Sequence, residues 1–173
     1  MRTEASQIAS SDHGKVAVVE PVYNDSNMSY TGELFIGSGE NPQKIRCIFD
    51  TGSANPWVLS KQGTRDMDPD DDAWYFDPEL SPSFEEPYDE DKEWVSISFG
   101  TGSINGYFVQ DQVILGDPKD PENQLLVPDW KFGMVTSHEN MFDGKFDALI
   151  GMAYPEFAEP GAETFFDGLM RTG

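Results

Sequence analysis

Short apolar runs, rich in β-branched and aromatic residues, recur along the chain and alternate with polar or glycine-containing stretches. Runs of this kind are typical of β-strands. The pattern predicts single strands, a long hairpin around a Gly-Thr-Gly turn, and a final buried strand followed by a bend. The single strands are 15–22, 30–37, 44–50 and 57–59, the hairpin joins 93–100 to 103–115, and the buried strand is 147–154. These runs predict a mainly β fold, and the sequence shows no internal repeat.

The two ends of the chain depart from this pattern. Residues 1–13 are small and polar, and we expect them to form a disordered tail. Residues 161–170 form the one predicted helix, although Gly168 lowers its helical propensity. The charged segment 61–72 has no periodicity and is predicted to be a loop. The remaining 14–173 is long enough to build one core and is expected to be a single domain.

Charge excludes several classes of partner. The chain has 32 acidic and 11 basic residues, a formal net charge of -21 and a pI near 4.1. Because phosphate recognition needs clustered lysine and arginine, we expect no nucleic-acid partner. No run approaches the roughly 20 apolar residues of a membrane span. The acid excess favours solubility, an acidic compartment or a basic partner, and composition does not choose among them.

Cysteine and histidine usage narrows the chemistry. Cys47 is the only cysteine, which excludes an internal disulfide and CxxC motifs, and its place in an apolar strand predicts a core residue. The two histidines, His13 and His138, favour neither a histidine-rich metal site nor a Ser-His-Asp arrangement. The amino terminus lacks the basic and then apolar regions of a secretory signal.

An acidic segment raises one metal hypothesis. Asp66, Asp68 and Asp70 stand at alternating positions and Asp77 falls twelfth, as in an EF-hand loop. However, Asp71 stands where that loop needs glycine, and no helices are predicted on either side. We therefore expect a solvated surface loop, and the sequence predicts no metal and no cofactor.

The strongest chemical signal is the apolar strand that ends at Asp50. It leads directly into the turn Thr51-Gly52-Ser53, and Trp57 follows closely. Asp-Thr-Gly alone usually marks an ordinary turn. With this lead-in, however, it presents one carboxylate at the end of a buried strand, in a tight loop rich in hydrogen-bond donors.

Two further segments follow in order. The hairpin tip 97–103 contains Phe99-Gly100-Thr101-Gly102, whose glycines give the backbone freedom that a lid needs. The segment 146–155 reads FDALIGMAYP, and Phe76-Asp77-Pro78 precedes the hairpin. Each alone predicts only a surface hairpin, a buried strand or a turn. Together with the Asp50 loop, in this order and spacing, they resemble the pepsin-like aspartic proteases (peptidase family A1) over about 15–173.

The resemblance implies roles for the loop residues. Asp50 would be the catalytic aspartate of the amino-terminal lobe, and Thr51 would form buried hydrogen bonds between the two lobes. Gly52 would bring main chain close to the carboxylates, and Ser53 would hydrogen-bond Asp50. It also implies flap and substrate-binding residues: Phe99, Gly100, Thr101, Ile48, Trp57, Phe146 and Leu149. Phe99 stands where most members have tyrosine, so the hydroxyl that would bond the Trp57 indole is missing.

The resemblance further implies one lobe of the bilobal pepsin-like β-barrel fold, with a short carboxy-terminal helix. Its activity would be peptide-bond hydrolysis by water activated between two aspartates. No second Asp-Thr-Gly or Asp-Ser-Gly occurs in the sequence. We therefore expect an amino-terminal lobe that is inactive without a carboxy-terminal lobe, from the same precursor or a separate chain, and a peptide or protein substrate.

Two other interpretations remain open. The chain could be a non-catalytic pseudoprotease that acts as a binding or structural subunit, which Phe99 and the missing second aspartate favour. The intact Asp50 loop favours the peptidase. A homodimer with one aspartate from each chain is disfavoured by the chain length. The family expectation for location is secretion or an acidic vacuolar or lysosomal compartment.

Overall fold

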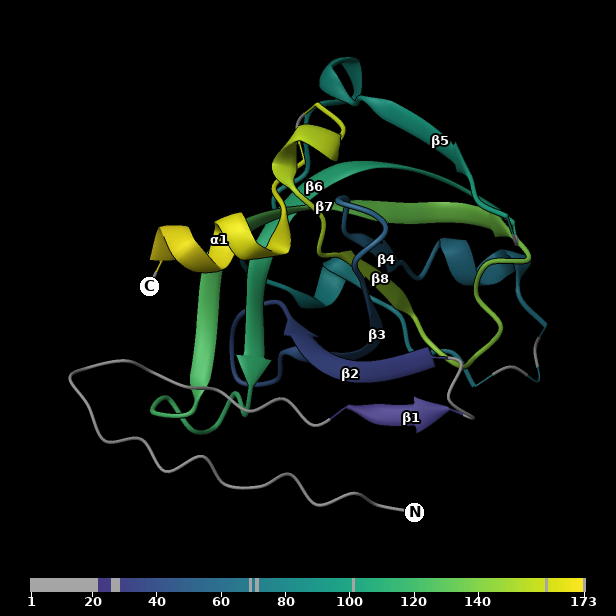
Figure 1. Ribbon diagram of the computed structural model, residues 1–173. Helices are drawn as coiled ribbons and strands as arrows, with labels where there is room; N and C mark the ends of the chain where they lie inside the picture. Colours follow the sequence, from purple (N-terminus) through teal and green to yellow (C-terminus); the bar gives the residue numbers. More distant parts are fainter. Residues whose placement is uncertain are drawn as a thin grey trace.

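The computed structural model describes residues 22–25, 29–68, 70, 72–100, 102–160 and 162–172. Eight strands and one short α-helix are the main elements of this part, so the mainly β prediction is confirmed (Figure 1). The strands are β1 (Tyr23–Asp25), β2 (Ser29–Ile36), β3 (Gln43–Asp50), β4 (Trp57–Leu59), β5 (Trp94–Ser98), β6 (Ser103–Gly116), β7 (Gln124–Glu139) and β8 (Ala148–Gly151). The helices are α1 (Phe165–Thr172) and the 3-10 turns η1 (Gly63–Asp66), η2 (Pro78–Leu80), η3 (Asp89–Asp91) and η4 (Pro155–Phe157).

The eight strands form one sheet that closes on itself. Their order is β1-β2-β3-β8-β4-β7-β6-β5, and β2 also pairs with β6 through Phe35–Ile114 and Ile36–Val113. The strands from β2 round to β6 therefore form a ring, in which β3–β8 and β4–β7 are parallel pairs. The long strands β6 and β7 change direction at two irregularities of register and project the β5–β6 hairpin beyond the ring (Figure 1).

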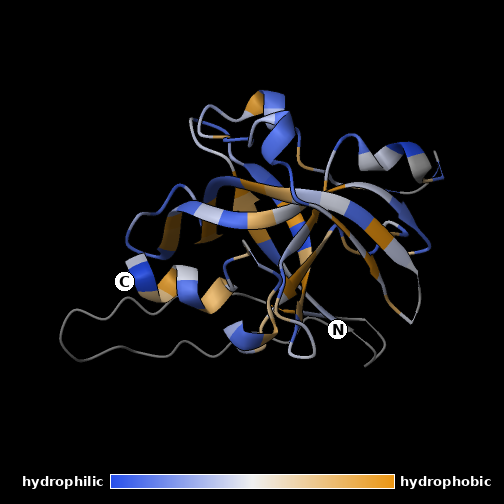
Figure 2. Cartoon of the chain, turned by 90° about the horizontal axis from the view of Figure 1, so that it is seen from above, coloured by the Kyte–Doolittle hydropathy of each residue, from blue (hydrophilic) through white to orange (hydrophobic). Residues whose placement is uncertain are grey.

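Alternating burial along the strands builds the core. Hydrophobic and hydrophilic positions alternate along the strands in Figure 2, and fully buried Leu34, Ile45, Phe132 and Ile150 meet inside the ring. Cys47 is buried in the same cluster, which confirms its prediction as a core residue. A second apolar cluster surrounds Trp57 and belongs to the candidate site.

Strand β7 is absent from the sequence prediction, although it is the longest strand described. Pro128 and Gly133 interrupt its apolar pattern and obscure the period of two. In the structure, β6 pairs with Trp130 on one side of an irregularity and with Val127 on the other, so Pro128 falls between paired positions. A proline there removes no ladder hydrogen bond, and this explains why it is tolerated inside a long strand.

The carboxy-terminal helix exists but begins later than predicted, at Phe165 instead of residue 161. Thr164 sets its start, because its hydroxyl accepts from the Asp167 N–H at 3.2 Å and donates to the Asp167 carboxylate at 2.6 Å. Phe165 packs on the Trp130 ring, and a Cβ at Gly168 would lie 3.1 Å from that ring. The predicted tail 1–13 and nearly all of the strand 15–22 lie outside the described residues.

A buried ion pair joins three parts of the ring. The fully buried carboxylate of Asp147 receives Arg46 Nε at 2.7 Å and Arg46 Nη2 at 3.1 Å, and the Trp74 N–H at 2.8 Å. The Leu59 N–H donates to the Asp147 carbonyl at 2.8 Å. Burial raises the pKa of Asp147, and Arg46 only partly opposes this rise. Arg46 therefore supplies the positive charge that offsets the cost of burying an ionised Asp147.

We expect Asp147→Ala to lower the free energy of unfolding by about 3 kcal/mol, because Arg46 would lose its buried counter-charge. Urea unfolding followed by tryptophan fluorescence measures the change. The matched control is Asp143→Ala, which removes an exposed carboxylate 2.7 Å from Lys145 and should cost less than about 1 kcal/mol. Equal losses in the two variants would contradict the role given to Asp147.

A second polar cluster supports the base of the β5–β6 hairpin. The Tyr107 hydroxyl donates to the Glu86 carboxylate, and Lys92 Nζ lies 2.9 Å from the same carboxylate and over the Tyr107 ring. Lys92 and then Tyr107 hold the pKa of Glu86 below its ordinary value of 4.5. Burial and then Glu86 raise the pKa of Tyr107 to about 12. The cluster thus requires an ionised Glu86.

Because the pKa of Glu86 is depressed in the fold, its stabilisation is complete above 4.5 and is lost as the pH falls through the folded value. We expect Glu86→Gln to flatten the dependence of the free energy of unfolding on pH in this acid range. Urea titrations at a series of acid pH values measure it. Glu90→Gln, which alters an exposed acid of η3, should leave the wild-type dependence intact. A Glu86→Gln curve that follows wild type would disprove the link.

Candidate active site

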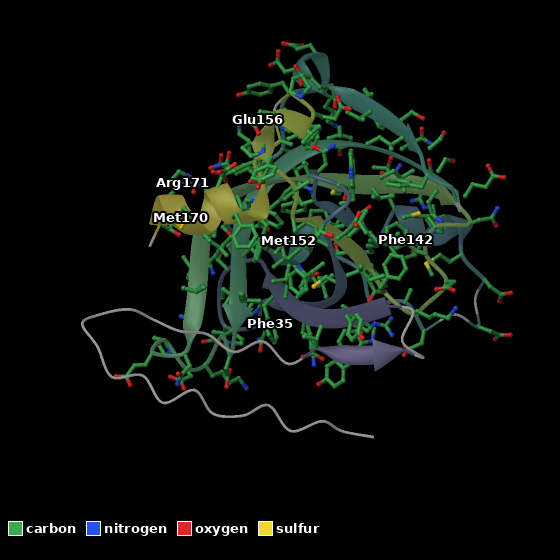
Figure 3. The ribbon with its side chains drawn as sticks, viewed as in Figure 1. Phe35, Phe142, Met152, Glu156, Met170 and Arg171 are labelled. Atoms are coloured by element: carbon green, nitrogen blue, oxygen red, sulfur yellow. The ribbon has the colours of Figure 1, made fainter. Side chains whose placement is uncertain are left out.

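Main-chain pairing fixes the position of Asp50. Asp50 is the last residue of β3 and lies opposite Gly151 of the parallel strand β8. The Met152 N–H donates to the Asp50 carbonyl at 2.8 Å, and the Ala153 N–H donates to the Ser53 carbonyl at 2.9 Å. Met152, labelled in Figure 3, lies just beyond the end of β8. Both ends of the Asp50–Ser53 loop are therefore attached to the chain that follows β8.

The loop itself supplies a donor to the carboxylate. The Gly52 N–H donates to Asp50 Oδ1 at 2.9 Å, and a Cβ at Gly52 would approach the same oxygen to 3.2 Å. Glycine thus permits the close approach of main chain that the sequence predicts. The Ser53 hydroxyl oxygen is buried and has no hydrogen-bond partner among the described residues, so the expected bond from Ser53 to Asp50 is not formed. Thr51 is exposed.

Two glycines allow the chain behind the loop to pack tightly. A Cβ at Gly151 would lie 2.3 Å from the Ala54 carbonyl carbon, and a Cβ at Gly133 would lie 2.2 Å from the Trp57 ring. Both distances are shorter than any real contact, so each position requires glycine. Gly133 was not indicated by the sequence, where its only signal is a lone glycine in an apolar run. The Trp57 indole occupies the space that Gly133 leaves open.

An apolar cluster surrounds this tryptophan. Leu149 pairs with both Ile48 and Trp57 in the sheet. The Phe108 ring centroid, which the sequence did not indicate, lies 5.4 Å from that of Trp57. The cluster contains all five of the apolar side chains that the resemblance implies: Ile48, Trp57, Phe99, Phe146 and Leu149. Residues from four separate segments of the chain thus form one apolar cluster beside the Asp50 strand, and Trp57 and Phe99 of this cluster also line a pocket.

The β5–β6 hairpin ends in a tight turn. The Phe99 N–H donates to the Gly102 carbonyl at 2.7 Å, which closes the tip. Gly100 is exposed with open space around it, and Thr101 lies outside the described residues. Ile97 and Phe99 share the apolar cluster with Trp57, so the hairpin faces the segment that follows Asp50.

A pocket of about 410 Å³ lies between the hairpin and the loop. Part of its lining comes from Phe157 and Glu159, which no sequence signal indicated. The Glu159 N–H donates to Asn55 Oδ1 at 2.8 Å, so this part of the lining is bonded to the segment that follows Asp50. The lining residues are Thr51, Gly52, Ser53, Ala54, Asn55, Trp57, Ile97, Phe99, Ala153, Phe157 and Glu159.

The arrangement suits proton transfer by the Asp50 carboxylate. It offers one partly buried carboxylate, an apolar cluster and the β5–β6 hairpin beside them.

Within the described ranges, no three His, Cys, Asp or Glu side chains are grouped to hold a metal ion, so the calcium hypothesis for the acidic loop gains no support. No helix in the described part of the chain is long and apolar enough to cross a membrane.

Comparison with known proteins identifies the family. Residues 29–173 match the family model described as eukaryotic aspartyl protease. Aspartic proteinase A2 of Arabidopsis thaliana is 32% identical over 94% of this chain and 29% of its own length. Cathepsin E of Mus musculus is 33% identical (89% and 36%), and pepsin-2B of Gadus morhua is 30% identical (88% and 43%).

The chain therefore spans less than half the length of each of these three relatives. The matched region contains the strand-end aspartate, the hairpin above it and the apolar surface between them. Its mainly β ring with one short helix is consistent with one lobe of the pepsin fold. The chain belongs to the pepsin-like family of aspartyl proteases.

Proposed function

We propose that residues 14–173 are the amino-terminal lobe of an aspartic endopeptidase, with Asp50 as one of its two catalytic aspartates. The observation that carries the proposal is the carboxylate of Asp50 at the end of β3, which accepts a hydrogen bond from the Gly52 N–H. The next residues of this loop, together with Phe99, line a pocket. Relatives named as proteinases, pepsin and cathepsin support it.

The chemistry requires a second carboxylate. Two carboxyl groups about 3 Å apart cannot both ionise, so the pair shares a proton and one member stays charged. The ionised member takes a proton from the attacking water, and the protonated member donates to the peptide carbonyl. A second lobe, in the same polypeptide or in another chain, would supply the partner of Asp50. The exposed hydroxyl of Thr51 is free to bond across the two lobes.

The peptide would lie between the loop and the hairpin. The apolar surface of Ile48, Phe146 and Leu149 would receive the side chain before the scissile bond, and Phe99 would cover it. Excluding water in this way strengthens the electrostatic interactions at the carboxylates. By itself, the lobe has the binding surface and half of the catalytic pair, and we expect it to be inactive alone.

We expect Asp50→Asn to reduce kcat about 100-fold or more, because an amide can neither share nor accept the catalytic proton. The measurement is cleavage of a fluorogenic peptide at acid pH by the full-length protein with both lobes. Asp143→Asn, an exposed carboxylate in the same lobe, serves as the control. Cleavage that survives Asp50→Asn would remove Asp50 from the mechanism. A wild-type protein that binds the peptide without cleaving it would favour a non-catalytic binding subunit.

We expect Phe99→Tyr to raise kcat/KM about fivefold, the equivalent of one added hydrogen bond of about 1 kcal/mol to the Trp57 indole. Phe99 and Trp57 line the same pocket, so we expect the added hydroxyl to come within reach of the indole N–H. Phe157→Tyr adds the same hydroxyl on the opposite wall and should have little effect. The two variants are compared in the same peptide assay. An equal response would mean that the hydroxyl does not act through Trp57.

A further inference from the structure

We infer that the pocket beside the catalytic loop selects a lysine or arginine side chain of the peptide, and that Glu159 determines this preference. The inference rests on the proposed peptidase function and names a substrate class for the same site. Glu159 lines the pocket, and none of the other described residues that line it is a lysine or arginine. None of the ion pairs formed among the described residues uses the Glu159 carboxylate.

The position of Glu159 is fixed relative to Asp50. Asn55 is nearly buried, with 8% of its surface exposed, and its Oδ1 accepts from the Glu159 N–H at 2.8 Å. The Ala162 N–H donates to the Glu159 carbonyl at 3.1 Å. Asn55 belongs to the loop that begins at Asp50, so the main chain of Glu159 keeps a defined place beside this loop, and the exposed side chain starts from that fixed point. Asn55 is therefore a positioning residue.

The walls of the pocket fit the shape of a basic side chain. Trp57, Ile97, Phe99 and Phe157 give it apolar sides, and Glu159 adds a carboxylate. Lysine and arginine have long apolar stems and a cationic end, so the stem can lie on the aromatic walls while the end reaches Glu159. An acidic side chain would meet a like charge, in a chain whose net charge is already -21.

The test is a positional scan with the full-length two-lobed protein. Peptides carry Lys, Arg, Gln, Leu or Glu at each position on both sides of the scissile bond, and kcat/KM is measured. We expect one position where Lys and Arg exceed the isosteric Gln about three- to fivefold, as for a partly exposed ion pair. Glu159→Gln should abolish this preference, Glu159→Lys should reverse it toward Glu, and added salt should weaken it.

Glu156→Gln is the matched control. It removes the same charge from the neighbouring η4 turn, where Figure 3 labels Glu156, but it does not line the pocket. It should leave the preference intact. Absence of any basic preference in wild type, or its survival in Glu159→Gln, overturns the inference. A loss that is as large in Glu156→Gln also overturns it, because the overall charge would then be responsible.

A binding measurement separates this inference from the proposed function. Fluorescence anisotropy with the same labelled peptides reports the preference without any cleavage. Tighter binding of Lys and Arg peptides that Glu159→Gln removes supports the pocket assignment, even if the protein cleaves nothing. In that case only the peptidase proposal fails. Cleavage without any preference for basic residues, in either assay, leaves the peptidase proposal intact and overturns the role of Glu159.

Discussion

The parallel pairing of β3 with β8 fixes the place of Asp50, and the rest of the site depends on it. A carboxylate at the end of a strand is useful only if the next residues turn sharply and stay ordered. Here Met152 and Ala153 bond the loop at both of its ends, and glycine at 151 lets the two segments approach. Together these contacts hold the Asp50 side chain in place.

Trp57 also requires a glycine as its neighbour, because its ring packs directly against the main chain of β7. Its indole occupies the space left by Gly133, and the sheet pairs Trp57 with Leu149. The apolar surface beside Asp50 is therefore an extension of the ring and depends on β7, which supplies Gly133. Closure of the ring between β2 and β6 then sets the direction of the hairpin that carries Phe99. Barrel and site are thus one structural unit.

The sequence predicted much of this site because each of its separate segments carries its own local pattern. The strand before Asp50, the turn after it and the glycines of the hairpin tip each leave a local pattern. Strand β7 left no such pattern, since Pro128 is tolerated only at a register irregularity that pairing creates. The hydroxyl of Ser53 was expected to bond Asp50 but is buried without a hydrogen-bond partner among the described residues. Residues distant in the sequence help to bury it, so no local pattern could predict this.

By itself, then, the sequence determined the mainly β class, the strand that ends at Asp50 and the apolar residues that gather around Trp57. Period-two burial and turn chemistry act over a few residues, so they can be read along the chain. Only the tertiary structure decided that Asn55 binds the main chain of Glu159 and that Arg46 neutralises buried Asp147. These contacts join residues about a hundred positions apart, 104 and 101 respectively, and no local pattern encodes which distant groups the closed sheet brings together.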